Sequence, residues 1–441
     1  MRLLVLCPHF EPDLHAATGE VMTKLVFALA ERGHTVDVVT SLPWYRLHDV
    51  EPEWRGKPWR RSTTTAGDII RVWPFPTDKS NVPARAAAFA GFTAIATAAA
   101  LTLERPDIVL AMSPPIFLGN AAAAVARRWK VPFIFNVQDI FPDVAVELGA
   151  LSNPKVIDGA KKLERSLYRQ AAAVTVLSED QAANVRAKVD PADVDKVRII
   201  HNFVDLDRVK VTERQNAWRA EKGLEDKTIV MYAGNVGLSQ SFDLVEHAAT
   251  AYADRPDVHF VINGEGAGRP AVEAWAARYD NVSTFDFVGR EGVSDLLGAA
   301  DLHLILLKTG LSRSSTPSKL YGIMAAGRPI LASIDLGSEV DLIVARADAG
   351  RTVPPDDPAS FLEALNELLA QPMEMEEMGQ RARHYVEELL TPETQAAAYE
   401  RLFTEMIDIS GEGRAYRPNR RRDAPRRAAS RAFQQHSDRR Q

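Results

Sequence analysis

The sequence predicts an α/β protein of two doubly wound domains that face each other across a cleft, followed by C-terminal helices and a disordered basic tail. Two observations carry this prediction. Short apolar runs, suited to buried parallel strands, alternate with helical segments through most of the chain, and the alternation begins again near Val209. The chain of 441 residues is also long enough for two globular domains and an extension.

The first domain opens with a strand at 3–7, a helix at 19–32 and a strand at 35–40. The loop before the helix, PHFEPDLHAATG, is not a GxGxxG turn, and no acidic residue ends the second strand. A nicotinamide-binding fingerprint is therefore absent, which disfavours a dehydrogenase. Gly19 still opens the helix at the sheet edge where ligands bind, and it would let a ligand approach the backbone closely.

Two later stretches of the first domain each allow two interpretations. Residues 41–68 are irregular and carry Trp44, Tyr45 and two further tryptophans among many charges. This loop could contact a sugar or a membrane surface, or it could pack on its own aromatic rings. Residues 84–103 form an Ala-rich apolar helix of roughly membrane-spanning length. Because alanine is weakly hydrophobic and polar residues interrupt the run, a packed or interfacial helix is favoured over a membrane span.

Two carboxylates follow a buried strand at 132–137, in the segment QDIFPDVAVELG. Asp139 and Asp143 thus lie at the ligand-binding edge of the sheet, where a carboxylate can accept a proton from a hydroxyl group. Asp143 follows Pro142 and would suit the cap of the next helix. Asp139 is therefore the preferred catalytic residue.

The sequence predicts no metal ion and no cofactor. The pair Asp205-x-Asp207 is similar to a metal-binding DxD, but no other clustered ligands accompany it, so it is assigned to a turn. Cys7 is the only cysteine, which excludes an intramolecular disulfide and a cysteine-rich metal site and fits a reducing cytoplasm. The apolar run at the N-terminus is about six residues long, too short for a signal peptide.

Four strands of the second domain end in glycine-rich or basic turns. The first turn, GNVGLSQS, could cradle a phosphate, and the second, NGEGAG, is of the same kind. The candidate binding residues at the four turns are Asn235, Gln240, Gly264, Glu265, Arg290 and Lys308. Each turn alone is a weak signal, and their recurrence in one domain is a stronger one.

A further phosphate site is expected in the stretch SSTPSKLYGIMAAGRPILA, residues 314–332. Ser318 can cap a helix of about two turns that carries Lys319 in its first turn and ends at Gly327. A helix N-terminus with a lysine is a place to hold a phosphate. The alternative is an ordinary capped helix between a loop and a strand.

We place the first domain at 1–208, the second at 209–390, a terminal helix that packs back on the first domain at 391–410, and the disordered tail at 411–441. The tail carries ten arginines against three acidic residues, a charge of +7 in a chain of net charge −6. It is either a solvated tail or a segment attracted to anionic lipid head groups. Nucleic acid is disfavoured because the body is acidic and has no recognition motif.

These motifs resemble family 4 of the GT-B glycosyltransferases, which consist of two Rossmann-like domains. The matching segments are QDIFPDVAVELG, AGNVGLSQ, NGEGAGR and PSKLYGIMAAGRPILA, with HNFVDLDRV between the domains. They are most similar to the branch that contains fucosamine transferases of O-antigen synthesis and related exopolysaccharide enzymes. The resemblance extends to about Ile409 and excludes the tail.

The resemblance implies a nucleotide-sugar donor in the second domain, an acceptor at the first, and transfer with retention in the cleft without a divalent metal. Lys319 and the helix N-termini would stabilise the departing diphosphate, and Asp139 would orient or deprotonate the acceptor hydroxyl. The candidate residues on the donor side are Gly19, Asn235, Gln240, Gly264, Glu265, Arg290, Lys308, Ser318, Lys319 and Tyr321.

The sequence departs from the family pattern in two places. Asn235 and Gln240 stand where many members place Arg and Lys, so Arg290, Lys308 or Lys319 would have to compensate. The family's paired glutamates, usually spaced E-x7-E, align with Ser314 and Gly322. Recognition of the ribose would then pass to a neighbour such as Tyr321.

The leading hypothesis is a cytoplasmic, peripheral-membrane glycosyltransferase that moves a hexosyl or amino-sugar unit from a nucleotide-diphosphate sugar to a lipid-linked acceptor. A nucleotide-sugar epimerase or hydrolase of the same fold is the alternative enzyme, and it would turn over without an acceptor sugar. A non-catalytic nucleotide-sugar-binding subunit is the third reading, favoured by the missing glutamates.

Overall fold

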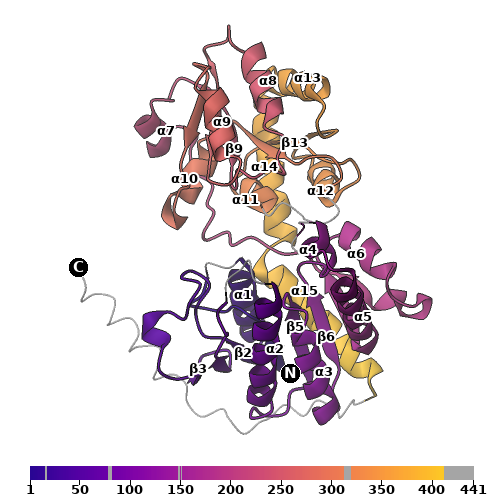
Figure 1. Ribbon diagram of the computed structural model, residues 1–441. Coiled ribbons are helices and arrows are strands. Elements are labelled where there is room, and N and C mark those ends of the chain that lie inside the picture. Colours follow the sequence, from indigo (N-terminus) through magenta and orange to yellow (C-terminus); the bar gives the residue numbers. More distant parts are fainter. Residues whose placement is uncertain (15–16, 78–81, 148, 150, 312–318, 412–441) are drawn as a thin grey trace.

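The protein consists of two α/β bodies, one above the other in Figure 1. The computed structural model describes residues 1–14, 17–77, 82–147, 149, 151–311 and 319–411. The predicted cap Ser318 and the aligned position Ser314 lie outside the described residues, as does the basic segment 412–441.

The first body is built on an eight-stranded sheet in the order β3-β4-β2-β1-β5-β6-β7-β8. Every strand except β3 runs parallel to its neighbours, and β3 pairs antiparallel with β4 at one edge. The strands are β1 (Arg2–Leu6), β2 (Thr35–Ser41), β3 (Trp59–Thr63), β4 (Asp68–Val72), β5 (Ile108–Ser113), β6 (Phe133–Val137), β7 (Ala173–Val176) and β8 (Val197–Ile199). The strand order reverses between β1 and β5, and such sheets bind ligands there, beyond the C-terminal strand ends.

Helices cover both faces of this sheet. One face packs on α2 (Val82–Ala100), α3 (Leu118–Trp129), α5 (Pro154–Gln170) and α6 (Glu179–Arg186), and the other on α1 (Ala17–Glu31) and α15 (Pro392–Ile409). The shorter helices are η1 (Pro52–Trp54), α4 (Asp143–Glu147) and η2 (Pro191–Lys196). Alanines of α2 are buried against the sheet, so this helix packs inside the first body. No helix among the described residues is long and apolar enough to cross a membrane.

Polar side chains fix where several helices begin. Asn153 precedes Pro154, the first residue of α5, and accepts a hydrogen bond from the N–H of Lys155 at 3.0 Å. Thr391 begins α15 with a capping box, in which its side chain accepts from the N–H of Thr394 and the Thr394 side chain accepts from the N–H of Thr391. These contacts satisfy N–H groups that the first helical turn leaves free.

The second body contains a six-stranded parallel sheet in the order β11-β10-β9-β12-β13-β14. Its strands are β9 (Thr228–Ala233), β10 (Val258–Asn263), β11 (Val282–Phe285), β12 (Leu302–Leu306), β13 (Ile330–Ser333) and β14 (Gly350–Val353). Its helices are α7 (Ala217–Lys222), α8 (Asp243–Ala251), α9 (Arg269–Ala276), η3 (Arg290–Gly292), α10 (Val293–Gly298), α11 (Lys319–Ala325), α12 (Glu339–Ala347), α13 (Pro358–Leu369) and α14 (Pro372–Leu389).

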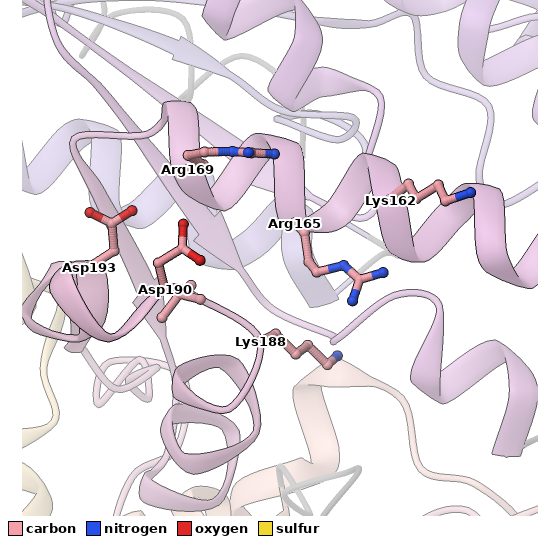
Figure 2. Close-up of a pocket in the computed structure, with 7 residues that line it drawn as sticks. Lys162, Arg165, Arg169, Lys188, Asp190 and Asp193 are labelled. Carbon is pink, nitrogen blue, oxygen red and sulfur yellow. The ribbon is translucent and has the colours of Figure 1, made fainter.

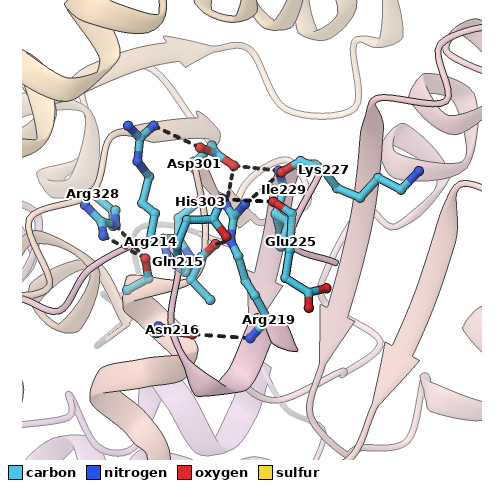
Figure 3. A network of polar contacts seen from close by, with 12 residues as sticks. Arg214, Gln215, Asn216, Arg219, Glu225, Lys227, Ile229, Asp301, His303 and Arg328 are labelled. Atoms are coloured by element: carbon cyan, nitrogen blue, oxygen red, sulfur yellow. Dashed lines mark hydrogen bonds and ion pairs between the residues drawn. The ribbon is translucent and has the colours of Figure 1, made fainter. Parts of the chain in front are cut away.

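A buried ion pair joins the starts of β9 and β12 (Figure 3). Nη2 of Arg219, a fully buried side chain of α7, lies 2.5 Å from Oδ2 of Asp301. The same carboxylate accepts from the N–H of Ile229 at 2.7 Å and pairs with Arg214 at 3.0 Å. The pair is fully hydrogen-bonded, as a buried charge requires. Because it lies at the beginning of the strands, it stabilises the edge opposite to the one where ligands bind.

The last helix returns to the first body, where α15 packs beside α1 (Figure 1). The hydroxyl of Tyr399 reaches between β6 and β7, where it accepts from Nδ2 of Asn136 at 2.9 Å and lies 3.4 Å from Oγ1 of Thr175. Both ends of the described chain therefore build the core of the first body.

The stretch at 41–68, expected to be irregular, contains the edge strand β3. Its sequence WRRST has no alternation of apolar and polar residues, and its side chains are exposed or half-buried. A strand at the edge of a sheet needs only one hydrogen-bonded neighbour, here β4, and buries little side-chain surface. The periodicity on which strand prediction depends is therefore missing.

Candidate active site

The C-terminal edges of the two sheets face each other. The N–H of Glu179, just after β7, donates to Oε2 of Glu339, just after β13, at 3.2 Å. In return, the N–H of Glu339 donates to Oδ2 of Asp180 at 3.1 Å. The first turns of α6 and α12 thus cap each other across the gap between the bodies. These contacts bring the segments that follow β7 and β13 together.

Two glycine turns contact each other at the ends of β9 and β10. Gly234 has φ +138° and Gly264 has φ +139°, values that side chains rarely allow. A Cβ on Gly264 would lie 1.9 Å from the carbonyl oxygen of Gly234. The turns continue the sheet beyond its strands, because the N–H of Val236 donates to the carbonyl of Glu265 at 2.8 Å. Only glycine at both positions permits this contact.

Several backbone N–H groups of these turns donate to other parts of the protein. Those of Gly234 and Gly264 donate to Asn263 and Phe285, each at 2.9 Å, and that of Gly268 donates to Val236 at 2.8 Å. These three N–H groups are therefore not free to bind a phosphate in this structure. The two glycines allow the backbones of the turns to approach each other closely. Any positive charge at the site must then come from side chains.

Lys319, the first residue of α11, lies beside Gly234 of the first glycine turn. Its Nζ is 3.6 Å from the ring centroid of Tyr232 and 3.2 Å from where a Cβ on Gly234 would lie. This Nζ is buried and has no hydrogen-bond partner among the residues that the structure describes. Burial lowers the pKa of Lys319 to about 7. A buried unpaired ammonium is costly, so this position favours an anionic partner.

Gln240 and Lys308 brace the loop that follows β9. Oε1 of Gln240 accepts from the N–H of Gly237 at 2.8 Å, and Nζ of Lys308 donates to the carbonyl of Leu238 at 2.8 Å. Asn235 is exposed at the same turn. These residues lie together at the loop after β9, and Gln240 and Lys308 use their polar atoms to hold it.

The other donor-side candidates are spread more widely. Glu265 is exposed on the second glycine turn, and Arg290 begins η3, where its backbone alone is described. Tyr321 is buried in the core formed with α12 and α14, and burial raises the pKa of its hydroxyl. Tyr321 therefore does not join Lys319 at the glycine turns. Arg269, missed in the sequence, donates to the carbonyls of Gly264 and Phe285 and braces the second turn.

Asp139 lies directly after β6 and keeps an exposed surface, while the protein atoms around its carboxyl group remove part of its hydration and raise its pKa. The residue before it is firmly held: Nε2 of Gln138 donates to Oδ1 of Asn136 at 2.8 Å, and its Oε1 accepts from Nδ2 of Asn202 at 2.9 Å. Asp143 opens α4 and accepts from Nζ of Lys188 at 2.7 Å. Of the two carboxylates, Asp139 is the more exposed, whereas Asp143 is held in an ion pair with Lys188.

A histidine–aspartate pair after β1 was missed in the sequence. Nδ1 of His9 lies 3.2 Å from Oδ2 of Asp13, which also accepts from the N–H groups of Trp44 and Tyr45 at 3.3 Å each. Burial alone would raise the pKa of Asp13, but His9 and the two N–H groups outweigh it and lower the pKa. The ring of His9 stacks on Trp44, with centroids 5.8 Å apart. The aromatic loop therefore packs on its own rings and on His9. A histidine and an aspartate four residues apart after the first strand were the available signal.

The loop that carries His9 and Asp13 explains why residue 19 is a glycine. A Cβ at this position would lie 2.5 Å from the carbonyl oxygen of Asp13 and 3.1 Å from Cβ of His9. The close approach expected of a ligand is made by the protein's own backbone.

A pocket of about 240 Å³ lies between α5 and η2, away from these strand ends (Figure 2). Its lining is Lys162, Arg165, Arg169, Lys188, Val189, Asp190 and Asp193. Nζ of Lys188 already pairs with Asp143 and Glu164 inside the first body, so the pocket is not part of the gap between the sheets.

The predicted turn at Asp205 is engaged in protein contacts. Its Oδ2 pairs with Nζ of Lys24 at 2.7 Å, and its Oδ1 accepts from the N–H of Asp207 at 3.1 Å. Among the described residues, no three His, Cys, Asp or Glu side chains are grouped so that they could hold a metal ion.

Two family models match the chain, one over each body. A glycosyl transferase 4-like domain matches residues 17–202, and a glycosyl transferases group 1 domain matches residues 227–371. Two Rossmann-like domains with glycine turns facing a gap define the protein as a GT-B glycosyltransferase. The chain belongs to family 4 of this class.

Individual proteins are similar over most of the chain. The putative colanic acid biosynthesis glycosyl transferase WcaI of Escherichia coli is 26% identical over 342 residues, which are 74% of this chain and 82% of that protein. Sucrose-phosphate synthase of Thermosynechococcus elongatus has a TM-score of 0.68 at 18% identity, covering 93% of this chain and all of that one. Anabaena Alr3699/HepE in complex with UDP has a TM-score of 0.65 at 12% identity, covering 92% and 100%. The structural likenesses show the fold.

Proposed function

We propose that the protein is a retaining glycosyltransferase that moves a hexosyl or amino-sugar unit from a nucleotide-diphosphate sugar to a lipid-linked acceptor in cell-surface polysaccharide synthesis. The observation that carries this proposal is Lys319, whose buried amine lies at the glycine turns of the second body and has no hydrogen-bond partner in the described part of the chain. A diphosphate is the part of such a donor that would pair with it.

The donor assignment is supported by chemistry as well as by likeness. Lys308 adds a second cation near the same loop, and neither Asn235 nor Gln240 brings a charge. In a closed site, positive side chains stabilise the charge that develops on the departing diphosphate. The Anabaena neighbour of the same fold is described in complex with UDP, which supports a nucleotide as ligand.

The acceptor assignment rests on the first body. Asp139 stands at the end of a central strand, and its raised pKa suits a group that exchanges a proton with a sugar hydroxyl. The colanic acid relative supports an acceptor of the cell-surface polysaccharide class. The basic segment 412–441 would hold the enzyme at the anionic inner membrane surface, beside a lipid-linked acceptor.

The test is a transfer assay with UDP-, GDP- and dTDP-sugars and a lipid-linked monosaccharide acceptor. We expect one donor class to yield a glycosylated lipid whose anomeric configuration, read by NMR, equals that of the donor. Lys319→Met should abolish transfer, while Lys227→Met, at the opposite end of β9, should not. An inverted product would overturn the retaining mechanism, and release of free sugar or an epimer without acceptor would identify a hydrolase or epimerase.

A further inference from the structure

Lys319 is enclosed by groups that cannot balance a positive charge. From β9, the ring of Tyr232 faces it, and the hydroxyl of that tyrosine donates to the carbonyl of Asn235 at 2.6 Å. From β12, the nearby His303 is neutral, because burial lowers its pKa to about 4. The turn after β9 offers only the backbone of Gly234. No carboxylate among the described residues forms an ion pair with Lys319.

These surroundings set the charge of Lys319 when the site is empty. The face of an aromatic ring attracts a cation, but it replaces only part of the hydration that burial removes. Lysine responds to burial by losing its proton, whereas arginine would keep its charge. Burial lowers the pKa of Lys319 to about 7, so at pH 8 the amine is mostly neutral.

We propose that Lys319 takes up one proton when the diphosphate of the donor binds, so that ligand and hydrogen ion enter the site together. The inference rests on the proposed function, because it needs a diphosphate beside Nζ. The proton leaves a hydronium ion or a buffer acid in the solvent, whose bond to hydrogen breaks, and forms an N–H bond with the lone pair of Nζ. The bound diphosphate would then stabilise the ammonium that the empty site disfavours.

The proposal fixes how affinity depends on pH. Below pH 7 the amine is already protonated, so binding takes up few protons. Above pH 7 the uptake approaches one proton, and the dissociation constant should rise about tenfold per pH unit until the pKa of the bound state is reached. The phosphates contribute little at pH 8, because the second pKa of a phosphate group is about 6.

Calorimetry of UDP, GDP and dTDP binding to the full chain tests this proposal directly. Titrations at pH 8 in two buffers of different ionisation enthalpy give the number of protons taken up. We expect about 0.9 proton at pH 8, where the phosphates are already ionised, from a pKa near 7 in the free protein. Binding at pH 8 with equal heat in both buffers would overturn proton uptake and leave the proposed function standing. Binding of none of the three nucleotides would overturn the proposed function itself.

Variants assign the proton to its residue. Lys319→Arg keeps the charge in the free protein, so binding at pH 8 should no longer take up a proton. Lys227→Met removes a lysine from the far end of β9 and should leave the uptake unchanged. If Lys319→Arg still bound the nucleotide with about 0.9 proton, another group would be the acceptor and the proposal would be wrong. The wild-type measurement decides the question even if a variant does not fold.

Discussion

His201 of the first body and Glu339 of the second form an ion pair across the gap, with Nδ1 of His201 3.2 Å from Oε1 of Glu339. The same Nδ1 lies 2.8 Å from the carbonyl oxygen of Leu177, so it carries a hydrogen. Glu339 is almost fully buried, and burial raises its pKa although the charge of His201 acts in the opposite direction. One carboxylate thereby joins His201 and the start of α6 to the second body.

We expect Glu339→Ala to lower the free energy of unfolding by about 1–3 kcal/mol, because the partly buried N–H of Glu179 loses its charged acceptor. Glu339→Gln should lose less, since its amide oxygen can still accept from that N–H. Urea unfolding at pH 7 measures both variants. An equal loss in the two would contradict the role of the contact.

The same carboxyl group gives a pH dependence of known sign. Its pKa is raised in the folded state, so its contribution to stability is present below the ordinary pKa of a glutamate and is lost as the pH rises through the folded value. The wild type should therefore lose stability relative to Glu339→Gln as the pH rises over this range.

Lys319 should make the empty protein less stable at neutral pH. Its pKa is about 7 when folded and about 10.4 when unfolded, so the unfolded state binds more protons between these values. Unfolding free energy should rise with pH in this window by up to about 1.4 kcal/mol per unit. Lys319→Met should be more stable than the wild type at pH 7 and should lack this rise. Parallel curves for the two proteins in urea unfolding would contradict the buried, unpaired lysine, and Lys227→Met serves as the matched control.

Asp139→Asn should lower kcat about 10²–10⁴-fold, the usual contribution of an acid–base group. Because burial raises the pKa of Asp139, the acid limb of kcat/KM in the wild type should lie above the ordinary pKa of an aspartate. Asp143→Asn breaks the pair with Lys188, so it should reduce stability and leave the acid limb in place. An unchanged acid limb in an active Asp139→Asn variant would exclude Asp139 as the titrating group.

Asp13→Asn should destabilise the first body at neutral pH, because it weakens contacts to His9 and to two backbone N–H groups. The folded pKa of Asp13 is lowered, so its contribution is complete above the ordinary pKa of an aspartate and is lost as the pH falls through the folded value. The gap in unfolding free energy between wild type and variant should shrink in acid. A constant gap from pH 7 to pH 3 would show that the carboxylate charge is not what stabilises the loop.

Removal of residues 412–441 should weaken binding to vesicles that contain anionic lipid and should leave turnover of a soluble acceptor analogue unchanged. These residues include ten arginines, and each arginine near an anionic surface contributes about 1 kcal/mol. Cosedimentation with anionic and zwitterionic vesicles separates charge attraction from general adsorption. Equal binding of the full and shortened chains to anionic vesicles would contradict the prediction that this segment binds the membrane.

The sequence predicts the parallel strands well. Strands such as β1, β5 and β10 are nearly continuous apolar runs, because they are buried on both faces of the sheet. It also indicates the glycine turns at Gly234 and Gly264. Their mutual contact depends on neighbouring strands 30 residues apart in the chain, which local patterns do not reveal. The burial of Lys319 could not be predicted from neighbouring residues in the sequence either, because it depends on Tyr232 and Gly234, which are far from it along the chain.

The pairing of Tyr399 with Asn136 has a consequence for synthesis of the chain. One face of the sheet in the first body is covered by α1 and α15, and α15 is made only at the end of the described chain. Until then, Asn136 and Thr175 have no tyrosine hydroxyl between them. The second body is synthesised after β8 and before α15. The first body is therefore begun first, but its last helix is added only after the second body has been made.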